Sequence, residues 1–538
     1  MTTSVNDDVA ITEPRPSAKS ADKQPTPDHL VIIIGAGFSG IGTAITLQKN
    51  GFHDLLLIDE ADGVGGTWHW NTYPGIAVDI PSFSYQFSFE KQRNWSRSYA
   101  PGRELKAYAE HCVEKYGLAD KIRFNTTVTG AVFDKQACLW KVSTAAGEQL
   151  TARFVINACG VLTRPVYPEI QGIEDFTGQT MHTARWDHGQ SVAGKRVGII
   201  GTGASAVQIV AAIAPEVERL TVFQRTPIWC LPKPDFSLRG TVSRFLTRLP
   251  GGLQATRLVS QAFVEATFPI PAHYHGAIPG MSPVAESLAR RYLHSQVRDP
   301  ETREKLTPRY GLGCKRPSFH NEYLATFNRD NVTLETDPIT GVGAHSVHVS
   351  SGVEHQLDML ILATGFKVMD PDNMPTYDLT GRDGLTQQAY WDTHRLHAYE
   401  GVSVPGFPNH FSIMGPYGYN GSSYFALIEA QSTHIARCLM RARKLDANYI
   451  EVTQRANDRF FAEMLRRRRR QIFWQDSCAH ANSYYFDKNG DAPLRPTTTW
   501  ESAWRSRTFN LANYRFEPWA PRAQNPRQWM TADRAAGL

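Results

Sequence analysis

Several features that would assign a protein to a class at once are scarce or missing in this chain. A strong charge of one sign is missing, since the chain has 57 basic and 52 acidic residues and a formal net charge of only +5 over 538 residues. Such an even balance gives no reason to expect a nucleic-acid partner. The densest charge run is five arginines at 466–470, inside a helix-like stretch at 454–472. We interpret this run as a solvated helix face or the rim of an anionic-ligand site, with a nucleic-acid or membrane patch as the alternative.

Cysteine is also scarce. The chain has seven cysteines at scattered positions, and no two of them have CxxC spacing. This pattern argues against a disulfide framework, a zinc ribbon and a dithiol redox centre, and it suits the reducing cytoplasm. We therefore expect a cytoplasmic protein without a metal site.

Long hydrophobic runs are missing as well. The first 28 residues are polar and have no apolar core of the kind found in signal peptides, so we predict a disordered tail. Segment 30–48 is uncharged, but it contains four glycines and its apolar run stops after Ile34. No stable insertion into a membrane is expected.

Two stretches of the chain share one pattern. The sequence LVIIIGAGFSGIGTAITLQKNGFHDLLLIDE at 30–60 reads as strand, glycine turn, helix and strand, and KRVGIIGTGASAVQIVAAIAPEVERLTVFQR at 195–225 repeats it. A continuous apolar first strand is typical of a parallel sheet that is covered on both faces. We predict an α/β fold with two Rossmann-like dinucleotide-binding domains.

The first unit ends in an acid. Gly35, Gly37 and Gly40 form GxGxxG, which lets the backbone approach a pyrophosphate at a helix N-terminus. Asp59 follows the first glycine by 24 residues (59 − 35), where a carboxylate accepts from ribose hydroxyls, and Glu60 is the neighbouring candidate. This unit should bind a dinucleotide without a 2′-phosphate.

The second unit ends in a base. Gly201, Gly203 and Ala206 form GxGxxA, and the residue at the same offset (225 − 201 = 24) is Arg225, followed by Thr226. A guanidinium with a neighbouring hydroxyl suits a 2′-phosphate, which an acid would repel. The two units together predict FAD in the first and NADPH in the second.

The remaining chain indicates how the two domains are connected. The segment DMLILATG at 358–365 has the form of a strand that returns to close a flavin site, and 235–312 has helical spacing with proline-rich breaks. We predict an FAD-binding domain at 29–170 and 355–538, and an NADPH-binding domain at 171–354 that contains a mostly helical insertion at about 235–312.

Two longer motifs make the prediction specific. FTGQTMHTARWDHG fits F-x-G-x-x-x-H-x-x-x-W-[P/D], and GGTWHWNTYPGIAVD at 65–79 fits [A/G]-G-x-W-x-x-x-x-[F/Y]-P-[G/M]-x-x-x-D. With them the chain resembles the Baeyer–Villiger monooxygenases from about residue 29 to 510. The residues of the first motif are Phe176, Gly178, His182, Trp186 and Asp187. We expect His182 to be a buried linker histidine bonded to backbone and not the chemical base, and Trp186 to pack at a domain hinge.

The resemblance implies a function. Such enzymes use NADPH and O₂ to convert a ketone to an ester or lactone through a flavin peroxide and a tetrahedral adduct. It implies that Arg316 stabilises the negative charge and that Asp79 is its partner. The implied FAD contacts are Gly35, Gly37, Ser39, Gly40, Asp59, Glu60, Gly66, Thr67, Trp68, His69, Trp70, Asp79, Tyr85 and Val128. The implied NADP contacts are Gly201, Thr202, Gly203, Ala204, Ser205, Ala206, Gln208, Arg225, Thr226 and Lys315.

The partners and the alternatives follow from the same comparison. We expect O₂ and a small ketone as substrates, and aromatic residues in 376–430 and 473–504 suggest a fairly apolar pocket. Sulfoxidation is expected as a side activity. The nearest alternative is a related flavin monooxygenase that oxygenates nitrogen or sulfur, and a more distant one is a non-catalytic NADPH-binding redox sensor.

Overall fold

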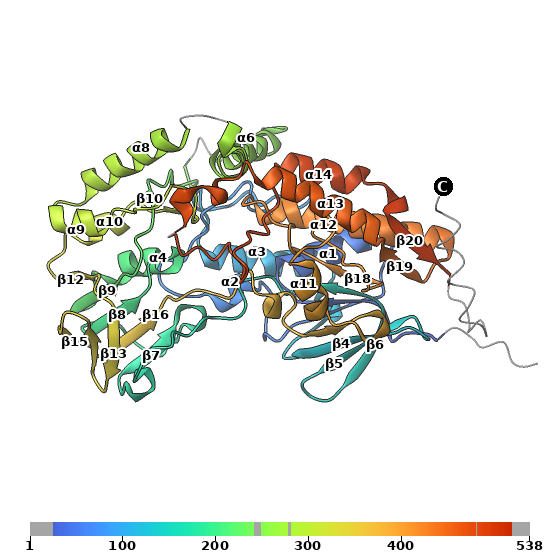
Figure 1. The fold of residues 1–538 in the computed structure, drawn as a ribbon, viewed down its shortest axis with the longest axis horizontal. Helices are drawn as coiled ribbons and strands as arrows, with labels where there is room; N and C mark the ends of the chain where they lie inside the picture. Colours follow the sequence, from blue (N-terminus) through green and yellow to red (C-terminus); the bar gives the residue numbers. More distant parts are fainter. Residues whose placement is uncertain (1–24, 241–248, 278–280, 480, 519–538) are drawn as a thin grey trace, which may run out of the picture.

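The structure, a computed structural model, describes residues 25–240, 249–277, 281–479 and 481–518. Most of the predicted tail at 1–28 lies outside these residues. Figure 1 shows two lobes, each built on a sheet, with helices α6 (Gly252–Thr267) and α8 (Met281–Gln296) above them.

The first sheet has eight strands in the order β17-β4-β5-β6-β1-β2-β3, with β18 also paired to β6. The central strand β1 lies parallel to β2 and β6, and Ile34 at its end is opposite Ile58 and Asn157. The carboxyl ends of these strands therefore meet at one edge, which is where open α/β sheets bind ligands. The strands are β1 (His29–Ile34), β2 (Leu55–Ile58), β3 (Ile122–Arg123), β4 (Val128–Asp134), β5 (Leu139–Thr144), β6 (Gln149–Asn157), β17 (Asp378–Thr380) and β18 (His410–Ser412).

The second sheet has five strands in the order β12-β9-β8-β16-β7. All of its pairs are parallel, and Ile200 at the end of β8 is opposite Phe223 and Leu362. The strands are β7 (Gln179–His182), β8 (Arg196–Ile200), β9 (Arg219–Phe223), β12 (Val332–Glu335) and β16 (Met359–Leu362).

The placement of β16 corrects one prediction. This strand was expected to close the first sheet, but it lies between β7 and β8 in the second. A short apolar strand fits either parallel sheet, so its sequence does not specify its neighbours. Two later strands do return to the first sheet: β17 pairs with β4, and the fully buried β18 pairs with β6.

The chain crosses between the lobes twice, at one place. Pro165 and Phe366 form an antiparallel bridge. On either side of it the Val166 amide donates to the Gly365 carbonyl at 2.9 Å, and the Lys367 amide donates to the Arg164 carbonyl at 3.1 Å. The outgoing and returning segments are therefore hydrogen-bonded to each other.

The helical insertion is confirmed, and it contacts both lobes. Val264 and Phe268 at the end of α6 belong to the apolar cluster of the first sheet. Leu293 and Val297 at the end of α8 belong to the cluster of the second. The insertion therefore lies against both halves of the molecule.

Helices cover the sheets and connect their strands. The longest is α12 (Tyr424–Leu445), which lies against α1 (Phe38–Lys49) beside the first sheet. The others are α2 (Thr67–Trp70), α3 (Gly102–Lys115), α4 (Ala204–Ile213), α7 (Pro269–His273), α9 (Pro300–Lys305), α10 (Tyr323–Thr326), α11 (Gln387–His394), α13 (Gln454–Arg468) and α14 (Thr499–Thr508). Smaller sheets are β10 (Cys230–Leu231) with β11 (Ser318–Phe319), β13 (Ile339–Gly343) with β14 (Ser346–Val349) and β15 (Glu354–Gln356), and β19 (Tyr449–Val452) with β20 (Tyr514–Glu517).

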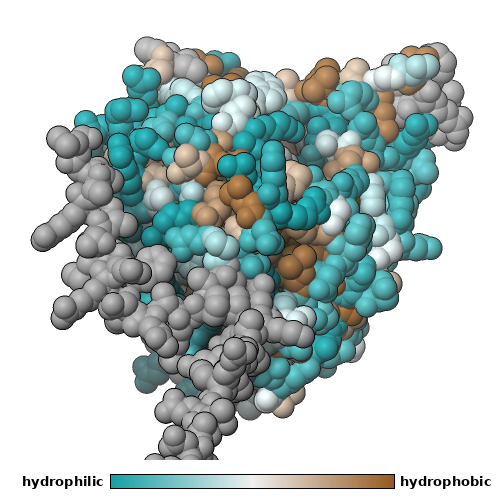
Figure 2. Space-filling model, turned by 90° about the vertical axis from the view of Figure 1, so that its right-hand side faces the viewer, coloured by the Kyte–Doolittle hydropathy of each residue, from teal (hydrophilic) through white to brown (hydrophobic). Residues whose placement is uncertain are grey.

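The surface that Figure 2 shows is mainly hydrophilic, with separate small apolar patches. Within the described part of the chain, no helix is both long enough and apolar enough to cross a membrane.

Candidate active site

The first glycine turn is closely packed against its own backbone. Gly35 has φ +111°, and a Cβ there would lie 2.5 Å from the Ala158 carbonyl oxygen. A Cβ on Gly40 would lie 1.9 Å from the Gly35 carbonyl oxygen, and one on Gly37 would lie 3.4 Å from the Cα of Gly66. The turn therefore accepts only glycine at Gly35 and Gly40, and it presents bare backbone at the start of α1.

The acid at the end of β2 is held in place by the same turn. The Ala36 amide donates to Oδ2 of Asp59 at 2.5 Å, and the Ala61 amide donates to Oδ1 at 2.9 Å. Burial raises the pKa of Asp59 above its ordinary value. Each carboxylate oxygen has a further lone pair that can accept from a ribose hydroxyl. The neighbouring Glu60 is exposed, and it also lines the cavity described below.

The window at 65–79 forms a wall opposite this turn, with one exception. Gly66, Thr67, Trp68, Trp70 and Asp79 all line the cavity, but His69 does not. The His69 ring contacts Asp62 at 2.9 Å and Lys106 at 3.1 Å instead. The His69 side chain therefore points away from this cavity, because successive residues of a helical turn point in different directions.

Asp79 and Arg316 lie side by side although 237 residues separate them. Arg316 Nε donates to Asp79 Oδ2 at 2.7 Å, and its Nη1 donates to the Tyr419 hydroxyl and the Gly421 carbonyl at 3.2 Å each. Its guanidinium also lies 4.4 Å from the centre of the Phe268 ring on the helical insertion. The predicted pairing of the two residues is therefore present.

Their charges stabilise each other. Burial alone would raise the pKa of Asp79, but the charge and hydrogen bond of Arg316 hold it below its ordinary value. Burial alone would lower the pKa of Arg316, but the Asp79 carboxylate raises it. Both groups are therefore ionised at neutral pH, and a cation is held in a mostly buried site.

The second glycine turn is tight at one end and open at the other. Gly201 has φ +120°, and a Cβ there would lie 2.4 Å from the Ala363 carbonyl oxygen, whereas a Cβ on Gly203 would meet nothing within 4 Å. The Thr202 hydroxyl donates to the Thr226 carbonyl at 2.7 Å, which ties the turn to the end of β9. Ala206 is fully buried in α4. The free space at Gly203 lies where a pyrophosphate would approach the helix N-terminus.

The basic residues expected beside this turn lie near one another. Burial, and then the charge of Arg225, lower the pKa of Lys315, so the two cations face one region. The Thr226 hydroxyl accepts from the Asn482 amide at 3.0 Å. Two neighbouring cations suit a phosphate.

The first motif lies at the crossing between the lobes. His182 is 2% exposed, and its Nδ1 accepts from the Ala184 amide at 3.0 Å, which confirms a buried histidine bonded to backbone. Burial lowers the pKa of His182 to about 4, so it is neutral at pH 7. A Cβ on Gly178 would lie 2.6 Å from the Phe176 ring. The Asp187 side chain is used locally, because its Oδ1 accepts from the Gly189 amide at 2.8 Å.

The segment after His182 reaches the window at 65–79. The Arg185 guanidinium lies 4.0 Å from the centre of the Trp70 ring, and the partly buried Trp186 packs on the core of the second sheet. This region is therefore in contact with both lobes, as expected for a hinge.

One cavity of about 450 Å³ joins these parts. It contains the first glycine turn, the window, Tyr85, Val128 and the Asp79–Arg316 pair, and it reaches the second unit at Ala204, Ser205 and Gln208. The remaining predicted NADP residues, among them Arg225 and Lys315, lie beyond its lining. Bare glycine backbone, an acceptor at Asp59 and free space at Gly203 fit two dinucleotides that meet near Asp79.

Several residues of the cavity were not predicted individually. They are Tyr419, Ser422, Tyr424, Tyr484 and Tyr485. All five fall in the aromatic-rich stretches 376–430 and 473–504, so composition indicated the regions but not the positions.

The structure also corrects the expectation about disulfides. Cys314 and Cys478 form a disulfide across 164 residues, and the other five cysteines are free. Such a pair leaves no spacing signal, because only folding brings the two residues together. The bond joins the segment that carries Lys315 and Arg316 to the segment that carries Tyr484 and Tyr485.

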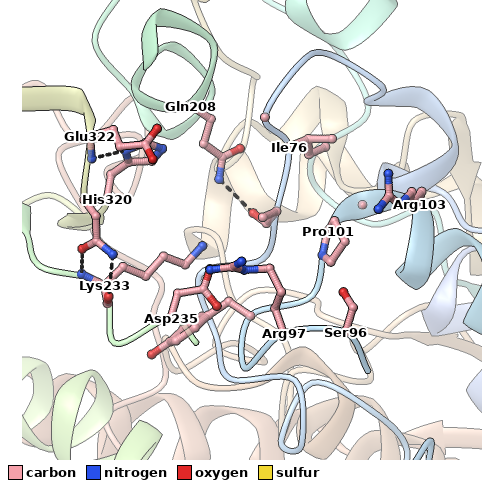
Figure 3. Close-up of a pocket in the computed structure, with 15 residues that line it drawn as sticks. Ile76, Ser96, Arg97, Pro101, Arg103, Gln208, Lys233, Asp235, His320 and Glu322 are labelled. Carbon is pink, nitrogen blue, oxygen red and sulfur yellow. Dashed lines mark hydrogen bonds and ion pairs between the residues drawn. The ribbon is translucent and has the colours of Figure 1, made fainter. Parts of the chain in front are cut away.

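A second cavity of about 560 Å³ lies behind the window. Figure 3 shows Lys233 extending into it between Gln208 and the Arg97–Asp235 ion pair, whose atoms are 2.8 Å apart. Gln208 donates to the Ala77 carbonyl at 2.8 Å and separates the two cavities. The charge of Lys233 contributes to the lowered pKa of Asp79, after that of Arg316.

Comparison with known proteins places the chain in a family. A family model described as pyridine nucleotide-disulphide oxidoreductase matches residues 32–264. A Baeyer–Villiger monooxygenase of Pseudomonas aeruginosa is 36% identical over 507 residues, which cover 91% of this chain and 93% of that protein. A Baeyer–Villiger monooxygenase of Streptomyces coelicolor is 33% identical over 498 residues, which cover 92% and 94%.

Solved structures agree with these relatives. The closed structure of a cyclohexanone monooxygenase has a TM-score of 0.82 at 29% identity, and covers 91% of this chain and 99% of its own. A complex of OTEMO with FAD and NADP has a TM-score of 0.81 at 27% identity, and covers 91% and 100%. These findings confirm the predicted fold class and the predicted FAD- and NADPH-dependent monooxygenase chemistry, and they do not favour the nitrogen- or sulfur-oxygenating alternative. The chain belongs to the Baeyer–Villiger monooxygenases.

Proposed function

We propose that this enzyme inserts one oxygen atom of O₂ beside the carbonyl carbon of a ketone. In balanced form, ketone, O₂, NADPH and a proton give an ester or lactone, NADP⁺ and water. The observation that carries the proposal is the Asp79–Arg316 ion pair at 2.7 Å, inside the cavity that joins the two glycine turns.

The two units take different cofactors. The first turn would hold FAD, with Asp59 accepting from its ribose, and the second would hold NADPH, with Arg225 and Lys315 on its 2′-phosphate. We place the FAD-binding domain at 29–165 and from 366 onward, because β16 belongs to the second sheet. When bound, reduced FAD supplies the activated oxygen.

The chain's own residues provide the electrostatics. Arg316 stabilises the negative charge that develops on the oxygens beside it, which is the largest catalytic term in many enzymes. Asp79 keeps the guanidinium in position and compensates its burial. The closely packed window limits access of water to these charges.

Replacing the guanidinium tests the assignment. Arg316→Ala should still be reduced by NADPH, since no hydride passes through this side chain, but its ester yield should fall at least ~100-fold. Flavin bleaching under anaerobic conditions and product analysis by mass spectrometry measure the two steps separately. Arg123→Ala, which breaks the exposed Arg123–Glu148 pair, is the control. Normal ester formation by Arg316→Ala would disprove the role.

The remaining proposals follow from this assignment. The physiological substrate is a small ketone that fits beside Arg316, and thioethers are oxidised as a side reaction. A cytoplasmic location is supported by the need for NADPH, whereas the Cys314–Cys478 disulfide is unusual for that compartment.

A further inference from the structure

The hydrogen-bond donors of Arg316 are only partly used by the protein. Nε donates to the Asp79 carboxylate, and Nη1 donates to the Tyr419 hydroxyl and the Gly421 carbonyl. Nη2 has no hydrogen bond to any residue that the structure describes. A substrate carbonyl oxygen can therefore accept from Nη2 while the contact with Asp79 stays intact.

Two tyrosines of the same cavity have a hydroxyl proton to donate. The Tyr419 hydroxyl accepts from Arg316, so its own proton points elsewhere, and no described residue accepts it. The Tyr424 hydroxyl has no hydrogen bond within the described chain. The two rings lie 4.9 Å apart at 32°, so the hydroxyls belong to one wall.

These hydroxyls remain donors at neutral pH. Burial raises the pKa of both Tyr419 and Tyr424 well above the ordinary value of 10. The neighbouring Ser422 does not compete, because it donates its proton to Glu265 at 3.2 Å. The wall near Arg316 therefore has two hydroxyl donors, those of Tyr419 and Tyr424, that no described residue accepts from.

A plain hydrocarbon ketone would satisfy only one of these groups. Its carbonyl would accept from Arg316, and its hydrocarbon body would displace water from the tyrosine hydroxyls without replacing the lost hydrogen bonds. Sites with such polar groups discriminate against analogues that cannot pair with them.

We infer that the preferred substrates are ketones that carry a second oxygen acceptor, such as an ether, ester or carbonyl oxygen, placed to reach the hydroxyls of Tyr419 and Tyr424. This inference rests on the proposed function and specifies its substrate class. It also modifies the expectation of a fairly apolar pocket, because the aromatic residues that form this wall are tyrosines.

A pair of ketones of one shape tests the inference. The probes are 1,4-dioxaspiro[4.5]decan-8-one and its carbocyclic analogue spiro[4.5]decan-8-one, which has methylenes in place of the two ether oxygens. We expect kcat/KM for ester formation to be about fivefold or more higher for the dioxa compound. Titration of the holoenzyme with each ketone, followed by tryptophan fluorescence, should give the same order of Kd.

Tyrosine-to-phenylalanine variants test whether the preference for the dioxa ketone depends on the hydroxyls of Tyr419 and Tyr424. Tyr424→Phe should bring the ratio of kcat/KM for the two ketones close to one, because it removes a hydrogen bond to the dioxa compound and removes the unpaired hydroxyl that disfavours the carbocyclic one. Tyr419→Phe should act in the same direction. Tyr116→Phe, which removes a hydroxyl that serves Glu90, is the matched control and should keep the wild-type ratio.

The possible outcomes distinguish failure of the inferred substrate class from failure of the proposed function. Equal or better turnover of the carbocyclic ketone by the wild type, or an unchanged ratio in Tyr424→Phe, overturns the substrate class while the Baeyer–Villiger activity stands. Failure of the wild type to form an ester from either ketone or from cyclohexanone, with the flavin reduced normally, overturns the proposed function and this inference with it.

Discussion

The two glycine turns follow one pattern but differ at both ends. In the first, Gly37 faces Gly66 of the window closely, and the following strand ends in Asp59, which two backbone amides hold. In the second, Gly203 faces open space, and the strand ends in Arg225 near Lys315. The first turn is thus built into the core of its lobe, while the second is an open surface. The difference suits a cofactor that stays bound and one that is exchanged at each turnover.

The largest effect is expected from filling the closed turn. In Gly40→Ala the new Cβ would lie 1.9 Å from the Gly35 carbonyl oxygen, so the backbone must move. We expect loss of bound FAD and a free energy of unfolding lower by about 1–3 kcal/mol. The ratio of flavin to protein absorbance and thermal unfolding measure this. A fully loaded, equally stable variant would show that the first turn is not as closed as its contacts indicate.

The same substitution in the open turn should have a different result. Gly203→Ala adds a methyl group where nothing lies within 4 Å, so fold and FAD content should be kept. The methyl group occupies the space for the pyrophosphate, and the Kd for NADPH should rise about tenfold or more, which corresponds to roughly 1.4 kcal/mol. Isothermal titration with NADP⁺ is the measurement. Loss of FAD from this variant would contradict the separation of the two sites.

Arg225, just after β9, should determine the preference for NADPH over NADH. Arg225→Ala should lower kcat/KM for NADPH by about 10–100-fold and change that for NADH little, because only NADPH has the 2′-phosphate. Initial rates of flavin reduction with each cofactor give the ratio. Arg219→Ala, which replaces an exposed arginine at the start of β9, is the control. Equal losses with both cofactors would assign Arg225 a structural role.

The smallest expected effect is a pH dependence of the first site. Burial raises the pKa of Asp59, so Asp59 takes up a proton earlier on acidification than an ordinary aspartate, and stabilisation of the apoprotein by this protonation grows as pH falls. Asp79 has the opposite sign, since its lowered pKa gives stability that is present above 3.8 and lost as pH falls through its folded value.

FAD affinity should therefore be weaker at a pH low enough to protonate Asp59 than at pH 7, because a protonated Asp59 has less capacity to accept from ribose. The Asp59→Asn variant should bind FAD weakly at both pH values and lack this pH dependence. Fluorescence titration of the apoprotein with FAD measures it. An equal pH dependence in the variant would assign the effect to another group.

Local sequence patterns predicted those parts of the site that are formed by residues close together in the sequence. Both glycine turns and Asp59 were located because strand, turn and helix signals follow one another along the chain, whereas the window at 65–79 was located by a motif of the family resemblance. The Asp79–Arg316 pair was predicted only through the family resemblance, since no local rule connects residues 237 positions apart.

The missed features are those that depend on tertiary neighbours. The sheet of β16, the pairing of Cys314 with Cys478 and the direction of His69 depend on packing between distant segments. Tyr419 and Tyr424 were seen as part of an aromatic stretch, but which hydroxyls face the cavity is decided by the start of α12 and the loop before it.

The paired crossing between the lobes restricts how they can move. Two chain segments, joined by the Val166–Gly365 and Lys367–Arg164 hydrogen bonds, act as one strap, and pulling the lobes apart would load both backbones along their length. Rotation about the strap leaves both bonds intact, so a swing costs less than a separation. The His182 ring packs edge-on against Phe366 with ring centres 6.0 Å apart. His182 therefore packs against the returning segment of the paired crossing itself.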